Sequence, residues 1–153
     1  MDRTAASRTL ALLRRHQGAW EGRYTHVAPP DWRVVATQDY RIEVETFDEG
    51  PVAYRQTSHY RFPDGRTETL RYEGALRTAD DRIVFDDGRI RGECWAIEDG
   101  TLYMWFAYAA APASRVTEMI QLSGDGLHRA RTWHWFEHEA LVKLTLVRER
   151  RTG

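Results

Sequence analysis

The feature that most constrains this chain is an alternation of apolar and polar residues that begins after Gly18 and continues almost to the C-terminus. Residues 33–47 show it clearly, because Tyr40, Ile42 and Val44 fall on one side of an extended chain and charged residues on the other. Turn-forming Gly, Pro and Asp residues separate the alternating runs. The pattern predicts strands at residues 20–27, 33–47, 53–62, 67–77, 82–86, 89–98, 101–108, 115–122, 128–136 and 140–150.

The connections between these strands are too short for crossover helices, which argues against a parallel α/β fold. Sequential hairpins that share an aromatic-rich core favour an up-and-down barrel, because closure removes the exposed edges of the sheet. The nonpolar segment 109–114 is expected to be a loop. We therefore predict an all-β, antiparallel up-and-down β-barrel.

A short helix is expected before the barrel. Residues 4–16 place four apolar side chains on one approximate helical face, with Ser7 as a plausible N-cap and Gly18 as a terminator. These side chains are Ala6, Leu10, Leu12 and Leu13. The expected organisation is one domain over residues 1–153, with the helix inside residues 1–17 and the barrel over residues 18–150.

Composition narrows the class of protein. The 153 residues are 42% hydrophobic and 29% charged with a net charge of −1, which argues against disorder and against a nucleic-acid binder. A single cysteine, Cys94, excludes an intramolecular disulfide and a Cys-rich zinc site. No apolar run suits a membrane span or a signal peptide, so a cytoplasmic protein without membrane contact is expected.

The first strand opens with Gly18-Ala19-Trp20, a G-x-W motif typical of lipocalins and their relatives. That resemblance implies that Trp20 closes one end of the barrel and that an Arg of the last strand stacks across it. Arg148 and Arg150 are the candidates, and Arg148 in this role would turn the apolar face of the last strand inward.

A wider resemblance rests on three segments, LLRRHQGAWEGRYTHV, VFDDGRIRGE and HRARTWHWFEHEALVKLTLVRERR, at residues 12–27, 84–93 and 128–151. Together they resemble a lipocalin-like (calycin) family of unknown function. That family is similar in fold to the phycobiliprotein lyases, which hold linear tetrapyrroles in a barrel. The resemblance implies a lipocalin-like β-barrel but neither a reaction nor a cofactor.

The strand at 128–136 carries the strongest candidates for a binding site. Arg129, Arg131, Trp133 and Trp135 share one face, which we expect to point into the barrel; an outward Arg–Trp stripe is the alternative. A buried Arg needs a partner, and Glu118 on the neighbouring strand is the natural one for Arg131. Further aromatic candidates for the wall of the site are Tyr54, Tyr60, Trp95 and Trp105.

Six histidines raise the question of a metal or haem site. Their spacing matches no common ligand motif, so neither a metal nor a cofactor is expected. The segment Gly18–Gly22 also resembles the opening of nitrobindin-like haem barrels, although the expected continuation is absent. That minor alternative would use His134 or His138 as the proximal ligand.

Two functions follow from these residues. In the first, the barrel binds a flat hydrophobic or aromatic small molecule with an acidic group, through an Arg clamp and stacked Trp rings. In the second, it is a cofactor-free cyclase, isomerase or lyase of small-molecule (natural-product) biosynthesis. The candidate catalytic residues are then Arg131, Glu118, His134 and Tyr60. A monomer or a homodimer is compatible with either function.

Overall fold

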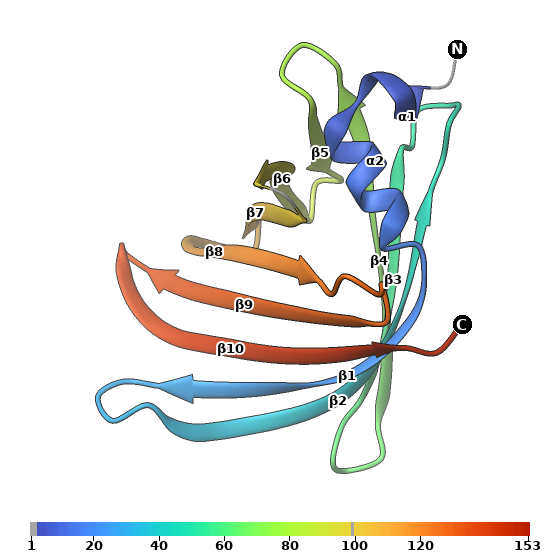
Figure 1. The fold of residues 1–153 in the computed structure, drawn as a ribbon. Helices are drawn as coiled ribbons and strands as arrows, with labels where there is room; N and C mark the ends of the chain where they lie inside the picture. The colour runs from blue at the N-terminus through green and yellow to red at the C-terminus, as the bar shows by residue number, and fades with distance from the viewer. Residues whose placement is uncertain (1–2, 99) are drawn as a thin grey trace.

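A computed structural model describes residues 3–98 and 100–153, and in this part of the chain ten antiparallel strands form a closed barrel (Figure 1). The strands are β1 (Gly18–Ala28), β2 (Arg33–Thr46), β3 (Tyr54–Arg61), β4 (Thr67–Arg77), β5 (Arg82–Asp86), β6 (Ile90–Glu98), β7 (Thr101–Tyr108), β8 (Ala111–Leu122), β9 (His128–Glu137) and β10 (Ala140–Arg151). Each pairs with its neighbours in sequence, and β1 pairs with β10 from Trp20↔Arg151 to Val27↔Leu144. The predicted all-β barrel is therefore confirmed.

The segment 109–114 differs from its prediction, because β8 already begins at Ala111. Its small side chains give no clear alternation, and the extended conformation comes instead from pairing with both neighbours. Ala111 lies opposite Tyr108 on β7, and Ser114 lies opposite Glu137 on β9.

Two short helices, α1 (Arg3–Ala6) and α2 (Arg8–Arg15), replace the single predicted helix. The break falls at Ser7, whose extended backbone lets its side chain accept a hydrogen bond from the Leu10 backbone N–H at 2.9 Å. Ser7 is thus the N-cap of α2, as predicted. Of the four apolar side chains expected on one helical face, the three leucines are buried. Ala6 is exposed because it precedes the break.

Helix α2 (blue in Figure 1) lies at the end of the barrel where β1 begins and β10 finishes. Trp20 is fully buried there, and its Nε1–H donates to the His16 carbonyl at 2.8 Å. The guanidinium groups of Arg129 and Arg151 lie 4.7 Å and 4.3 Å from the centre of its indole ring. Trp20 and α2 together close this end.

The predicted partners of Trp20 are wrong, because Arg148 and Arg150 are exposed on the outer face of β10. The odd-numbered residues of this strand face inward, and they include the buried Glu149. Local hydrophobicity favoured the opposite face. The inward orientation is stabilised instead by an ion pair between Glu149 and Arg129, which belongs to a different strand.

None of the described helices is long and apolar enough to cross a membrane.

Candidate functional site

The interior of the barrel contains a cavity of about 320 Å³. Every one of the ten described strands contributes at least one side chain to its wall. The lining residues are Tyr24, His26, Gln38, Tyr54, Gln56, Tyr60, Phe62, Glu68, Leu70, Tyr72, Phe85, Ile90, Met104, Phe106, Tyr108, Glu118, Arg131, Trp133, Trp135 and Lys143. The cavity is therefore a property of the closed sheet and not of a single loop or hairpin.

Aromatic rings form much of this wall. Tyr24 stacks on Tyr40 with their ring centres 4.0 Å apart and their planes only 9° from parallel. Trp133 packs against Tyr24 at 5.1 Å and meets Phe106 edge-on at 6.0 Å. Mutual packing of this kind fixes the orientation of each ring, so the wall presents flat, preorganised surfaces to a ligand.

A chain of buried ion pairs connects three strands at one side of the cavity. The Nε–H of Arg131 donates to Glu118 at 2.6 Å, and its Nη1–H donates to Glu149 at 3.4 Å. Arg129 donates to the other oxygen of Glu149 at 2.8 Å. All four side chains are almost completely buried, and their charges balance. Such a network avoids the large free-energy cost of an isolated buried charge.

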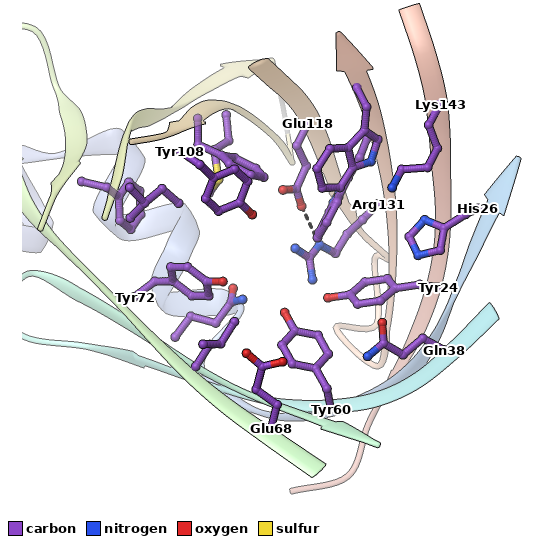
Figure 2. A pocket seen from close by; sticks show the side chains of 18 of the residues that line it. Tyr24, His26, Gln38, Tyr60, Glu68, Tyr72, Tyr108, Glu118, Arg131 and Lys143 are labelled. Carbon is purple, nitrogen blue, oxygen red and sulfur yellow. Dashed lines mark hydrogen bonds and ion pairs between the residues drawn. The ribbon is translucent and has the colours of Figure 1, made fainter. Parts of the chain in front are cut away.

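Arg131 and its partner Glu118 are the members of this network that line the cavity. Burial alone would lower the pKa of Arg131, but Glu118 and Glu149 outweigh that effect and raise the pKa well above its usual value. Within the described chain, its hydrogen bonds use Nε and Nη1 and leave Nη2 without a hydrogen-bonding partner. Figure 2 shows the guanidinium directed toward the middle of the cavity, where the hydroxyl groups of Tyr24 and Tyr60 also point.

Two more buried donors lie near this point. Neither the Tyr24 hydroxyl nor the Trp133 indole N–H has a hydrogen-bonding partner among the described residues. Burial raises the pKa of Tyr24, so its hydroxyl keeps its proton. Buried polar groups are normally hydrogen-bonded. Two donors without partners beside a cavity are therefore suited to contact water or a ligand.

The predicted orientation of β9 is confirmed. Arg129, Arg131 and Trp133 are buried inside the barrel, Trp135 lines the cavity, and the predicted ion pair between Arg131 and Glu118 is present. Arg129 lies outside the lining of the cavity, beside His16 and under the ring of Trp20.

The candidates Tyr54 and Tyr60 also line the cavity, as predicted. Both belong to β3, whose inward positions alternate with Arg55 and the other outward residues.

Trp95 and Trp105 were expected in the wall of the cavity, and both lie on the outer face instead. Trp95 packs beneath the guanidinium of Arg82, 3.8 Å from the ring centre. Trp105 donates its indole N–H to Glu93 at 3.1 Å. Their neighbours Cys94 and Phe106 occupy the inward positions, and stacking with arginine stabilises the large rings outside.

The prediction for His134 is also wrong. It alternates with Trp133 and Trp135, so it lies exposed on the outer face and cannot act as a base in the cavity. His138 is exposed beyond the end of β9, where its backbone has a φ of 48°. Neither histidine lines the cavity, so the haem arrangement with one of them as proximal ligand is wrong.

Most of the other lining residues were not predicted, and they include the polar or titratable side chains of Tyr24, His26, Tyr72 and Lys143. Tyr24 and His26 follow Trp20 at even spacing on β1, a signal that could have found them once Trp20 was placed inside. Lys143 could not be found in this way, because a lysine between Val142 and Leu144 looks like the exposed side of an apolar strand.

Metal and thiol chemistry receive little support from this cavity. Among the described residues, no group of three or more His, Cys, Asp and Glu side chains could hold a metal ion. Cys94 is buried, and burial raises the pKa of its thiol, which disfavours the nucleophilic thiolate.

Comparisons with known proteins were made by sequence and by structure. No protein-family model matches the chain, and no curated protein matches it. A protein of unknown function from the DUF3598 family of Nostoc punctiforme aligns with a TM-score of 0.68 and 19% identity, over 96% of this chain. This chain spans only 51% of that protein.

The S-type phycobiliprotein lyase CPES of Guillardia theta aligns with a TM-score of 0.75 and 12% identity, covering 100% of this chain and 98% of the lyase. EF1p2_mFAP2b, in a structure bound to DFHBI, aligns with a TM-score of 0.50 and 12% identity over 94% of this chain and 99% of its own. At the level of fold, the structure thus confirms the resemblance to a lipocalin-like family of unknown function that is similar to the phycobiliprotein lyases.

Proposed function

We propose that this protein binds a small, planar aromatic molecule with an anionic oxygen group inside the barrel. The observation that carries the proposal is the buried Arg131, whose guanidinium faces an aromatic cavity with one nitrogen free of hydrogen bonds to the described chain. A guanidinium in this position can donate to a carboxylate or phenolate, while the flat rings around it contact the body of the ligand.

The balance of charges inside the barrel limits how an anion could be held. The two arginines are already matched by Glu118 and Glu149, so a bound carboxylate would add a negative charge to a neutral interior. The unpaired hydroxyl of Tyr24 would offset part of that cost, because it points toward the same space as the guanidinium of Arg131 (Figure 2). Lys143 lies in the opposite part of the wall from Glu68, so the cavity has one basic and one acidic side chain besides the ion-pair network (Figure 2).

The volume of the cavity sets the size of the ligand. At about 320 Å³ it lies near the lower end of the range of small-molecule pockets, which is roughly 300–1,000 Å³. A compact aromatic acid suits this space better than a linear tetrapyrrole. The proposal therefore takes only the fold from the similarity to the phycobiliprotein lyase.

A cofactor-free cyclase, isomerase or lyase is the second candidate. Tyr60 and Tyr24 direct their hydroxyl groups toward the same space as Arg131, an arrangement that could polarise a carbonyl group of a bound substrate (Figure 2). This function cannot use His134 as a catalytic residue, because His134 lies on the outer face of the barrel. Conversion of a bound compound to a new product, followed by mass spectrometry, would favour this function over simple binding.

The test of the proposed function is to fill the cavity. 2-Naphthoate is titrated by calorimetry into the wild type, into L70W, which adds bulk to the lining, and into L146W, which adds the same ring to the outer face. We expect L70W to weaken binding by at least about tenfold, or about 1.4 kcal/mol, and L146W to leave it unchanged. Equal binding by all three proteins would place the ligand elsewhere, and no binding by the wild type would contradict the proposal.

A further inference from the structure

Lys143 is the only lysine in a chain with 22 Lys and Arg residues. It lies on β10 and lines the cavity that also contains Arg131. Arginine and lysine differ in one chemical respect that matters here: a guanidinium stays protonated in proteins, whereas an amine can lose its proton and become a nucleophile. The single primary amine among the side chains of the protein therefore lines the cavity of the proposed ligand.

Burial favours the neutral form of Lys143, whereas its contact with the ring of Trp135 favours the ammonium. The side chain is half-buried, with Nζ 4.1 Å from the ring centre of Trp135. None of the ion pairs between described residues involves it. Burial lowers its pKa, and the negative charge of Glu137 opposes this only in part. The other titratable groups of the nearby wall are His26 on β1 and, across the lumen, Glu68 on β4 (Figure 2).

A hydrogen-bonded chain beside Lys143 connects Trp135, Thr145 and His26. The indole N–H of Trp135 can only donate, and it donates to the Thr145 hydroxyl at 2.8 Å. The Thr145 hydroxyl lies 2.8 Å from Nδ1 of His26, to which it can donate its own proton. Burial lowers the pKa of His26, with a smaller contribution from Lys143, and so favours the neutral ring. An imidazole thus lies in the same wall as the amine.

We propose that Lys143 is a site of reversible covalent capture, at which the amine forms an imine with an aromatic aldehyde held in the cavity. The nitrogen lone pair attacks the carbonyl carbon to form a C–N bond, and a proton moves from nitrogen to the carbonyl oxygen to give a carbinolamine. The carbinolamine then loses its hydroxyl together with the remaining N–H proton as one molecule of water, and the nitrogen electron pair completes the C=N bond. No oxidant or reductant is required.

This inference rests on the proposed function in one respect, since a small aromatic molecule must enter the barrel. It adds a class of ligand, the aromatic aldehydes, and a chemical step. The ring of Trp135 under the amine offers a flat surface on which such an aldehyde can lie.

The test uses the fact that the chain has one lysine. Wild-type protein is incubated near pH 7 with 2-naphthaldehyde and cyanoborohydride, which reduces any imine to a stable amine. Intact mass and peptide mapping then show how fast, and where, a naphthylmethyl group is added. The comparison proteins are K143R and the double variant K143R/R148K, which moves the lysine to an exposed position on the outer face of the same strand.

We expect the wild type to be modified at Lys143 at least about tenfold faster than the double variant at its introduced lysine, because the cavity holds the aldehyde beside the amine of Lys143 and an exposed lysine has no such site. K143R should react only at the N-terminal amine. An excess of 2-naphthoate should slow the reaction of the wild type and leave that of the double variant unchanged.

Equal rates in the wild type and the double variant would overturn the inference, as would modification of the wild type at the N-terminus alone. Calorimetry with 2-naphthoate on the same wild-type sample separates the two failures. If naphthoate binds and Lys143 is not preferentially modified, the covalent site is wrong and the binding function stands. If neither occurs, both are wrong.

Discussion

His16 makes specific contacts with Trp20 and Arg129 at the closed end of the barrel. It is completely buried, its carbonyl accepts the indole N–H of Trp20, and its Nδ1 lies 3.3 Å from Arg129. Burial, together with the positive charge of Arg129, lowers the pKa of His16 to about 3. The ring is therefore neutral in the folded protein at every pH at which the protein is expected to work.

This histidine should make the protein sensitive to acid. Its pKa is 6.5 when unperturbed and about 3 when folded, so between these values the unfolded chain binds the proton and the folded chain does not. Stability is then lost as the pH falls through this window, by up to about 1.4 kcal/mol for each pH unit. Between pH 6.5 and 5 the free energy of unfolding of the wild type should fall by about 1.6 kcal/mol more than that of H16Q. Parallel pH dependences in urea denaturation would exclude His16 as the cause.

Because Arg131 bridges Glu118 and Glu149, a single and a double variant at this site should differ in stability. R131M leaves Glu118 buried without its partner and should destabilise the protein by about 3–5 kcal/mol. R131M/E118Q should recover much of that loss, because Glu149 keeps its ion pair with Arg129. Urea denaturation measures both; a double variant that is no more stable than R131M would show that the unpaired carboxylate is not the source of the loss.

At the scale of elements, the strands could be predicted closely because alternation and turn residues are local signals. What alternation cannot tell is which of the two faces of a strand is inside. On β10 the apolar Leu146 is 46% exposed, while Glu149 is buried against Arg129 of β9. On β7 the outward Trp105 is held by Glu93 of β6. In both strands the deciding partner lies on another element, so the local sequence does not reveal it.

The packing of Trp20 of β1 against α2 at the closed end of the barrel predicts how much stability its ring contributes. W20A should lower the free energy of unfolding by about 3–5 kcal/mol, because it leaves a cavity under α2 and removes the ring between Arg129 and Arg151. W105A, which removes an equal ring from the outer face, should cost clearly less. A loss below about 1 kcal/mol for W20A would mean that this tryptophan does not close the barrel.

For the whole molecule, the number of strands explains why an interior space exists. A barrel of roughly eight strands is just wide enough for its side chains to fill, and the diameter grows with each added strand. Here ten strands enclose the lumen, Trp20 and α2 occupy one end, and a cavity of about 320 Å³ is left between Arg131 and the aromatic wall. Its size depends on closure and register, which no single segment of the sequence specifies.

The central claim is that Arg131 recognises an anionic group of a planar ligand within this lumen. It is tested most directly by calorimetric titration of 2-naphthoate and of the neutral 2-naphthamide into the wild type and into R131M/E118Q. The wild type should prefer the anion by about ten- to a hundredfold, the contribution of a charge-assisted hydrogen bond. The variant should bind naphthamide as before and lose that preference. An undiminished preference for naphthoate in the variant would contradict the account.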